Sequence, residues 1–369
     1  MNDNERLFLI GLTGLKGVGD VLARQLLQYF GSAEEVFKAS RLLLEKTPGI
    51  GAFTAEKIDS DRSEALKSAE KELLFIEKNK ISLYAITSDD YPKRLKECQD
   101  APVVFYYRGI ADLNAAKIIS IVGTRRMTDY GRKLTEQFVK QLAEMFPELV
   151  IVSGLAYGAD VCAHRNALRN SLLTIGVLAH GFDRIYPAAH RTIATEMLTH
   201  GGLLTDFMSG TNPDRKNFLQ RNRLIAGLAD ATVIIESAMK GGSLVTADIA
   251  FSYGRDVFAF PGRTTDEFSS GCNRLIQINK AGLINSAKDL VVSLCWDTGS
   301  ASTAQPALFS FSEKPDHPII RLLQEKGEFH VNRLAIEMDI PIHKLTSVLF
   351  ELEMEGHIKA FPGGVYKLT

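Results

Sequence analysis

The middle of the chain alternates continuous apolar runs with amphipathic segments. Between two of these runs, Leu134, Phe138, Leu142 and Met145 recur on one face of a helix. The apolar runs have strand length and lack the alternation of a strand with one wet face. They lie at 117–122, 149–153, 173–178, 202–207, 231–235 and 256–260. This pattern predicts an α/β fold, an extended Rossmann-like doubly wound sheet with helices on both faces.

Glycine-rich and polar loops follow the predicted strands. In a doubly wound sheet the ligand lies outside the carboxyl ends of the strands. The loops at that edge are Gly123–Arg126, Gly154–Gly158, His180–Asp183, Glu236–Ser243 and Pro261–Arg263. We therefore expect the functional site where these five segments converge.

Residues 1–75 read as helices separated by two similar glycine turns, at 15–19 and 47–51. A Gly-hydrophobic-Gly turn at a helix start is typical of a helix-hairpin-helix, or SAM-like, domain. The backbone N–H groups of such a turn can meet a DNA phosphate without reading sequence. Few cations surround the second turn, so packing or protein contact is the favoured role. The sheet domain is expected at 76–295, beginning with two edge strands, Ile81–Ile86 and Val103–Arg108, around a loop with a short helix.

The C-terminal region predicts a linker at 296–314, rich in Ser, Thr, Ala, Gly and Pro, and a winged helix at 315–369. Three helical segments, 318–326, 330–338 and 342–355, precede a hairpin. A helix-turn-helix suggests a domain that recognises duplex DNA through the major groove. However, the recognition helix carries Glu351, Glu353 and Glu355, which repel phosphates. We therefore expect a protein-contact role for this domain.

Composition limits the candidate partners. The 369 residues are 45% hydrophobic and 24% charged, and the net charge is -1, so any affinity for nucleic acid must come from a local basic patch. The polar N-terminus and the absence of a long apolar run predict neither a signal peptide nor a membrane span. Four scattered cysteines predict reduced thiols rather than disulfides or metal ligands, and hence the cytoplasm.

The segment 213–246 combines two features that attract phosphate. Arg215, Lys216, Arg221 and Arg223 fall within one short stretch, and Gly241–Ser243 forms a glycine turn between a strand and a helix. Dinucleotide and Walker-A spacings are lacking, so neither NAD nor ATP is expected and no cofactor is predicted.

Arg125 and Phe218 are the residues whose types suit a nucleic acid. At the end of a strand, the Arg125 guanidinium can form a fork around a phosphodiester, and the alternative is an ion pair with a carboxylate of the crevice. Phe218 lies among cations, an arrangement typical of single-strand binding, in which a base stacks while its phosphate is neutralised. A core phenylalanine is the equally weighted alternative.

Catalysis is weakly supported. Asp160 and His164 share a helix face and could do acid–base work or bind a metal, but a helix cap and a packed histidine are favoured. Glu236 could be a general base or could anchor the glycine loop. No nucleophile set stands out, so we expect no catalytic residue and no metal.

Five sequence blocks resemble the DNA-processing protein DprA (Smf) family: Ser120–Gly131, Ile151–His164, Gly181–Pro187, Phe218–Asp230 and Gly241–Ala250. The resemblance implies a non-catalytic protein that binds single-stranded DNA, dimerises, protects DNA taken up in natural transformation and loads the recombinase RecA onto it. Among the family's DNA contacts, it assigns Arg125, Arg215 and the stacking Phe218. Leu219 replaces a proline that is common in the family. The expected DNA-binding residues are Gly123, Thr124, Arg125, Arg126, Arg215, Lys216, Phe218, Arg221, Asn222, Arg223, Gly241, Gly242 and Ser243.

Two other functions stay open at this point. A Rossmann-like nucleotide phosphoribohydrolase would use Glu236 as its acid–base group, and a transcription factor would read duplex DNA with the winged helix.

Overall fold

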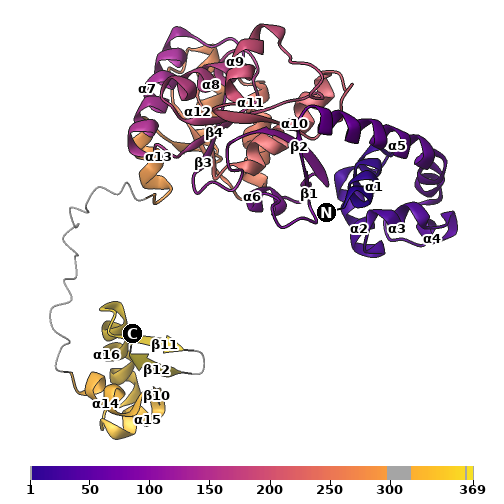
Figure 1. Cartoon of the computed structure of the whole chain (residues 1–369). Helices are drawn as coiled ribbons and strands as arrows, with labels where there is room; N and C mark the ends of the chain where they lie inside the picture. Colours follow the sequence, from indigo (N-terminus) through magenta and orange to yellow (C-terminus); the bar gives the residue numbers. More distant parts are fainter. Residues whose placement is uncertain (1, 297–316, 362–363, 369) are drawn as a thin grey trace. The chain divides into compact units, whose positions relative to one another are not determined.

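The computed structural model describes residues 2–296, 317–361 and 364–368. The chain divides into two compact units, with the division after residue 298 (Figure 1). The linker predicted at 296–314 lies outside the described residues, apart from Trp296.

The first unit begins with five helices, and the two predicted glycine turns precede two of them. Gly17 and Gly49 have φ values of 86° and 82°, a conformation that favours glycine, and each turn leads directly into a helix. The helices are α1 (Asp3–Gly14), α2 (Asp20–Phe30), α3 (Ala33–Lys38), α4 (Arg41–Glu45) and α5 (Ala52–Lys78). The helical N-terminal domain is therefore confirmed, although α5 runs across the boundary expected at residue 75.

A sheet of nine strands follows, in the order β1-β2-β6-β5-β4-β3-β7-β8-β9. The first two strands pair antiparallel with each other and with β6, and the remaining pairs are parallel. The strands are β1 (Ser82–Ala85), β2 (Val104–Gly109), β3 (Ile118–Val122), β4 (Val150–Ser153), β5 (Leu173–Val177), β6 (Gly201–Thr205), β7 (Ala231–Ile234), β8 (Asp256–Ala259) and β9 (Gly282–Leu283). All the predicted strands are present. The extra strand β9 is too short to leave a hydrophobic pattern.

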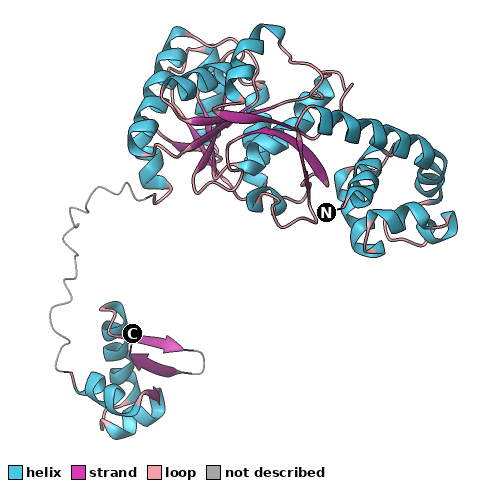
Figure 2. Ribbon diagram, viewed as in Figure 1, coloured by secondary structure: helices cyan, strands magenta, loops and turns pink. Residues whose placement is uncertain are grey.

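Helices cover both faces of this sheet (Figure 2). Ile118 and Val122 of β3 pack on the side of α10, α11 and α12, whereas Ile119 and Ile121 pack on the side of α7, α8 and α13. The helices are α6 (Lys93–Lys96), α7 (Asp129–Met145), α8 (Ala159–Arg169), α9 (Arg191–Met197), α10 (Arg215–Leu228), α11 (Gly242–Ser252), α12 (Ser270–Gln277) and α13 (Ala287–Ser293), with short 3-10 helices η1 (Ala188–His190) and η2 (Glu267–Ser269). Burial on both faces explains the continuous apolar runs and confirms the doubly wound fold.

The strand order reverses beside β3. The chain moves from β3 through β4 and β5 to β6, and α10 then carries it back to β7 on the other side of β3. The carboxyl ends of β3 and β7 therefore flank the switch point at which such sheets bind ligands.

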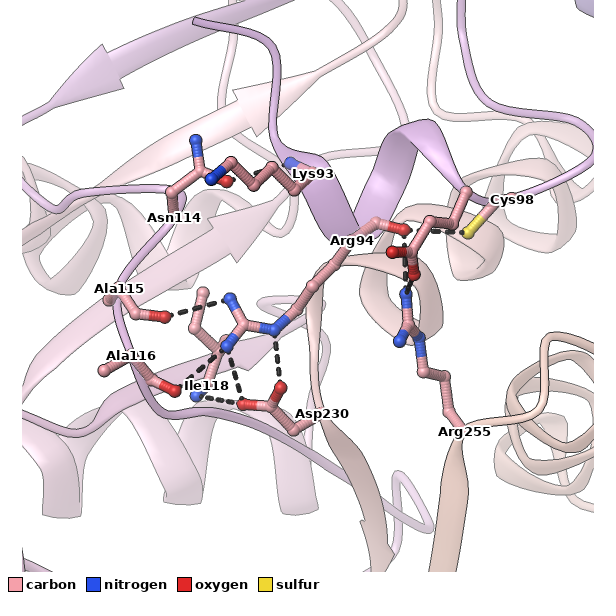
Figure 3. Close-up of polar contacts among 10 residues, drawn as sticks. Lys93, Arg94, Cys98, Asn114, Ala115, Ala116, Ile118, Asp230 and Arg255 are labelled. Atoms are coloured by element: carbon pink, nitrogen blue, oxygen red, sulfur yellow. Dashed lines mark hydrogen bonds and ion pairs between the residues drawn. The ribbon is translucent and has the colours of Figure 1, made fainter. Parts of the chain in front are cut away.

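The amino ends of the same two strands are held by a satisfied polar network (Figure 3). Arg94 of α6 binds both carboxylate oxygens of Asp230, at 2.6 and 3.0 Å, and donates to the carbonyls of Ala115 and Ala116. Asp230 also accepts from the N–H of Ile118 at 2.8 Å. This edge of the sheet thus uses its arginine to fix the positions at which β3 and β7 begin.

The helical domain packs directly on the sheet domain. Its core shares Val103, Val104 and Tyr106 with the edge strands. In addition, Glu72 of α5 accepts from the N–H of Ser209 at 2.9 Å. The two domains form one unit because they share a hydrophobic core.

The described residues of the second unit form three helices and a three-stranded antiparallel sheet in the order β10-β12-β11. Ile319, Leu323, Leu334, Leu345 and Leu349 form its core. Its elements are α14 (Pro318–Lys326), β10 (Glu328–His330), α15 (Val331–Glu337), α16 (Ile342–Met354), β11 (Ile358–Phe361) and β12 (Val365–Leu368). The three predicted helices and the two hairpin strands are present, and β10 is an addition. The winged-helix assignment stays a prediction.

Candidate nucleic-acid interface

Three loops pack closely at the switch point. Thr124 N–H, just after β3, donates to the carbonyl of Glu236, just after β7, at 2.7 Å. A Cβ on Gly123 would lie 2.7 Å from the Ala159 side chain, and one on Gly158 would lie 2.1 Å from the Thr124 carbonyl. Glycine is therefore required where the loops after β3 and β4 meet, and this packing fixes the backbone that carries Arg125.

Arg125 and Phe218 are in contact at this edge although they lie far apart in the sequence. The exposed Arg125 guanidinium lies 5.3 Å from the centroid of the Phe218 ring, which is half-buried in the first turn of α10. This separation is typical of a cation–π contact. Arg125 makes no ion pair with any carboxylate in the described part of the chain, so the ion-pair alternative for it is not realised. The Phe218 ring is neither fully buried in the core nor fully exposed to solvent.

The first turn of α10 carries cations where a helix usually favours acids. Arg215 and Lys216 are exposed and follow the N-cap Asp214. The positive end of the helix dipole disfavours cations at this position. Within the described residues neither side chain has an acidic partner. The local potential is therefore positive, which suits an anionic ligand better than it suits helix stability.

Arg221 and Arg223 were expected to meet phosphate, and the structure contradicts this. Arg221 is 3% exposed and donates to the carbonyls of Gly154, at 2.6 Å, and Val177. Burial lowers the pKa of Arg221 to about 10, against the opposing effect of Asp160. Asn222 is buried as well. From Arg221 onward α10 is buried, so the basic residues of this segment divide into an exposed group and a buried group.

Arg223 joins the helical domain to the sheet domain. Its guanidinium pairs with Asp20 of α2 at 2.8 Å and with Asp206 after β6, and it donates to the Asp100 carbonyl. Burial opposes the charge, but Asp206 and Asp20 raise the pKa of Arg223 above its usual value. This side chain is structural.

The glycine turn before α11 has the expected form. Gly241 caps α11, and a Cβ there would lie 2.3 Å from the Ser237 hydroxyl. Gly242 is exposed, whereas Ser243 is buried and donates from its hydroxyl to Ser237 at 2.9 Å. The turn thus presents backbone rather than the serine side chain to solvent.

Glu236 anchors the segment before α7, not the glycine loop that it was predicted to anchor. It is 3% exposed, and its carboxylate accepts from the Thr128 N–H at 3.0 Å and from the Thr128 hydroxyl. Thr128 in turn caps α7. A carboxylate enclosed in this way holds the start of α7 and has no open side for a substrate, so the hydrolase alternative is not favoured.

Asp160 and His164 are interior residues. His164 bonds to the Thr174 hydroxyl through Nδ1 at 2.7 Å, and its Nε2 has no partner. Burial lowers the pKa of His164 to about 3, with smaller effects from His190 and Arg221. Burial also raises the pKa of Asp160, against the opposing effect of Arg221. Across the described residues, no group of three His, Cys, Asp or Glu side chains is arranged to hold a metal.

Sequence reasoning missed Tyr186. Its ring is 48% exposed and lies 5.9 Å, centroid to centroid, from Phe218. The Tyr186 N–H donates to Nε2 of His180, whose Nδ1 bonds to the Gly181 carbonyl at 2.8 Å. The only sequence signal was the position of Tyr186 in a loop after a predicted strand, within the block 181–187.

The comparisons with known proteins agree with this architecture. A family model described as DNA recombination-mediator protein A matches residues 82–295, and a SAM-like helix-hairpin-helix tandem model matches residues 9–58. A curated relative, Protein Smf of Synechocystis, is 35% identical over 80% of this chain and 74% of its own length. None of the described helices is long and apolar enough to cross a membrane.

Two solved structures are similar to this one. The X-ray structure of DNA processing protein A from Streptococcus pneumoniae has a TM-score of 0.65 and 32% identity, covering 79% of this chain and 98% of that one. The DNA processing protein A of Helicobacter pylori, described for its single-stranded DNA binding mode, has a TM-score of 0.52 and 29% identity, covering 58% of this chain and 95% of that one. By its sequence blocks, its sheet and its relatives, the chain belongs to the DNA recombination-mediator protein A (DprA, Smf) family.

Proposed function

We propose that this protein binds single-stranded DNA, without reading its sequence, at the carboxyl edge of the sheet. One observation carries the proposal: Arg125 lies exposed over the half-buried ring of Phe218, beside Arg215 and Lys216, which lack acidic partners in the described structure. An aromatic ring among cations lets a base stack while its phosphate is neutralised. The relative from Helicobacter pylori, which is described for its single-stranded DNA binding mode, supports this substrate.

The geometry also favours a single strand over a duplex. The exposed cations lie on the loop after β3 and in the first turn of α10, both at the carboxyl edge, where they can follow the backbone of a single strand. Phe218 and Tyr186 stand side by side with exposed ring surface, which only unstacked bases can use.

The family resemblance extends the proposal. We infer that the protein acts in the cytoplasm as a non-catalytic homodimer, protecting DNA that enters in natural transformation and loading RecA onto it. The enclosed Glu236 and the interior Asp160 and His164 support a role without catalysis. The acidic residues of α16 support a protein-contact role for the second unit, so deletion of residues 300–369 should leave single-strand binding largely intact.

The decisive experiment is fluorescence anisotropy with a labelled oligo-dT at several salt concentrations, with duplex as the competitor. We expect tight binding that resists duplex and weakens steeply with salt. Arg125→Ala should weaken binding by roughly tenfold or more, because it removes a phosphate contact and the cation above Phe218.

Arg169→Ala is the matched control. Arg169 is also exposed but lies at the far end of α8, toward the amino edge of the sheet. Arg125→Ala that folds and binds as tightly as the wild type would refute the site. Equal affinity for duplex would refute the substrate class.

A further inference from the structure

A second group of aromatic and basic side chains lies on the other side of Arg125. The next residue, Arg126, is exposed, and its guanidinium lies 5.7 Å from the centroid of the Phe268 ring in η2. Consecutive arginines therefore lie over rings from different elements, Phe218 of α10 and Phe268 of η2. The loop after β3 therefore takes part in two cation–aromatic pairs.

A surface pocket lies beside this second pair. It has a volume of about 570 Å³ and is lined by Tyr130, Pro261, Gly262, Arg263 and Asp266. Tyr130, at the start of α7, is 55% exposed. The volume falls within the range of small-ligand sites, roughly 300–1,000 Å³, and is large enough for one nucleotide.

Hydrogen bonds to the loop after β7 hold this pocket in place. Ser237 N–H donates to the Phe268 carbonyl at 2.6 Å, and Gly271 N–H donates to the Ser237 carbonyl at 2.8 Å. Asn273 exchanges two hydrogen bonds with the backbone of Gly262, at 2.9 and 3.1 Å. The loop after β8 is thus tied to the same backbone that leads to the glycine turn at 241–243.

The charges indicate which part of a nucleotide fits. Arg263 and Asp266 both line the pocket and Glu267 follows Asp266, so the pocket has no net positive charge to hold a phosphate inside. Arg126 is exposed and does not line the pocket, so it can meet a phosphate outside it. An aromatic wall with an acidic neighbour suits a base, whose face stacks and whose amino or imino groups donate hydrogen bonds.

We propose that the pocket lined by Tyr130 is a second base-binding position on the same DNA strand, with Arg125 and Arg126 guiding the backbone from Phe218 to it. This inference rests on the proposed single-strand binding at Arg125 and Phe218. Short oligonucleotides occupy the Phe218 side alone, and longer ones reach both sides.

Oligonucleotide length provides the test. The experiment compares the wild type, Tyr130→Ala and Tyr130→Phe. Each protein is titrated with labelled oligo-dT of about 4 and of about 12 nucleotides, lengths within the site sizes of single-strand-binding folds. We expect Tyr130→Ala to lose roughly 5- to 100-fold in affinity for the longer strand, from the loss of one stacked base, and to bind the shorter strand unchanged. Tyr130→Phe retains the ring and should retain the affinity.

The outcomes separate the two proposals. If Arg125→Ala loses binding of both lengths but Tyr130→Ala binds both like the wild type, the second position is refuted and the primary site stands. Equal losses for both lengths in Tyr130→Ala also overturn a separate position. If the wild type binds neither strand, the proposed function fails, and the second position fails with it. Photo-crosslinking of a 5-iodo-deoxyuridine strand to Tyr130 gives an independent positive result.

Discussion

The first turn and the middle of helix α10 use the same residue type for opposite purposes. In its first turn, Arg215 is exposed and has no acidic partner in the described structure. Two turns later, Arg223 is buried and paired with two aspartates. The difference lies in the surroundings, because the helix enters the protein between these residues. A charge that the fold compensates is structural, whereas an exposed charge without a partner is available to a ligand.

The two edges of the sheet repeat this contrast. At the amino edge, Arg94 is enclosed by Asp230 and two carbonyls (Figure 3). At the carboxyl edge, Arg125 lies over the Phe218 ring and has no acidic partner in the described structure. A desolvated arginine without a carboxylate would be costly, so Arg125 remains at the surface where water or phosphate can serve it. The comparison predicts that substitution of Arg94 lowers stability but not DNA affinity, whereas substitution of Arg125 lowers DNA affinity but not stability.

The largest expected effect is on stability, at Arg223. Arg223→Leu leaves Asp206 and Asp20 without their partner and should lower the free energy of unfolding by about 3–5 kcal/mol. Urea unfolding followed by Trp296 fluorescence measures it, because Trp296 is the single tryptophan and packs on Phe146 of the first unit. Arg215→Leu is the control and should change the value by less than about 0.5 kcal/mol. Equal losses of stability in Arg223→Leu and Arg215→Leu would contradict the contrast between these two arginines of α10.

Arg94 should behave like Arg223, with a smaller effect. Arg94→Met removes charge-assisted hydrogen bonds from a partly buried site and should cost about 2 kcal/mol in the same unfolding experiment. Affinity for oligo-dT should be unchanged, because the network lies at the amino edge. A loss of affinity comparable with that of Arg125→Ala would show that the two edges are coupled.

Low pH should lower the stability of the protein through the buried His164 and not through the exposed His200. The pKa of His164 is lowered to about 3 by burial, so the unfolded chain binds more protons between that value and about 6.5. Stability is therefore complete above about pH 6.5 and falls as the pH decreases, by at most about 1.4 kcal/mol per unit from this residue. His164→Leu should flatten the dependence of the urea midpoint on pH, whereas replacement of the exposed His200 should leave it as in the wild type. An unchanged slope in His164→Leu would contradict the assignment.

The smallest effect concerns the salt dependence of DNA binding. Each exposed cation that neutralises a phosphate should contribute roughly 0.7 to the log–log slope on single strands. Lys216→Ala should reduce the slope by about that amount without changing the unfolding midpoint. Tyr186→Ala is the complementary variant, since loss of a stacking ring should lower the affinity but leave the slope unchanged. A slope that does not respond to Lys216→Ala would remove this residue from the interface.

Much of the fold followed from hydrophobic pattern. The buried strands, the two glycine turns and the helices of both units were predictable because local composition reports burial on one or both faces. Strand β9 and the extent of α5 were not, since a two-residue strand has no period and a long helix needs its packing partner. The strand order, and with it the switch point between β3 and β7, cannot be read from local pattern.

By itself the sequence determined the fold class, the family and the edge of the sheet at which the site would form. Glycines and cations follow strands in a fixed order, and parallel strands bring their carboxyl ends together. Only the tertiary structure decided which cations are available. Arg215, Arg221 and Arg223 look alike in a basic run, but burial depends on what packs against the helix, and Asp20 and Asp206 come from distant segments. Charge is a property of the residue, whereas its availability depends on desolvation and partners that only the folded chain supplies.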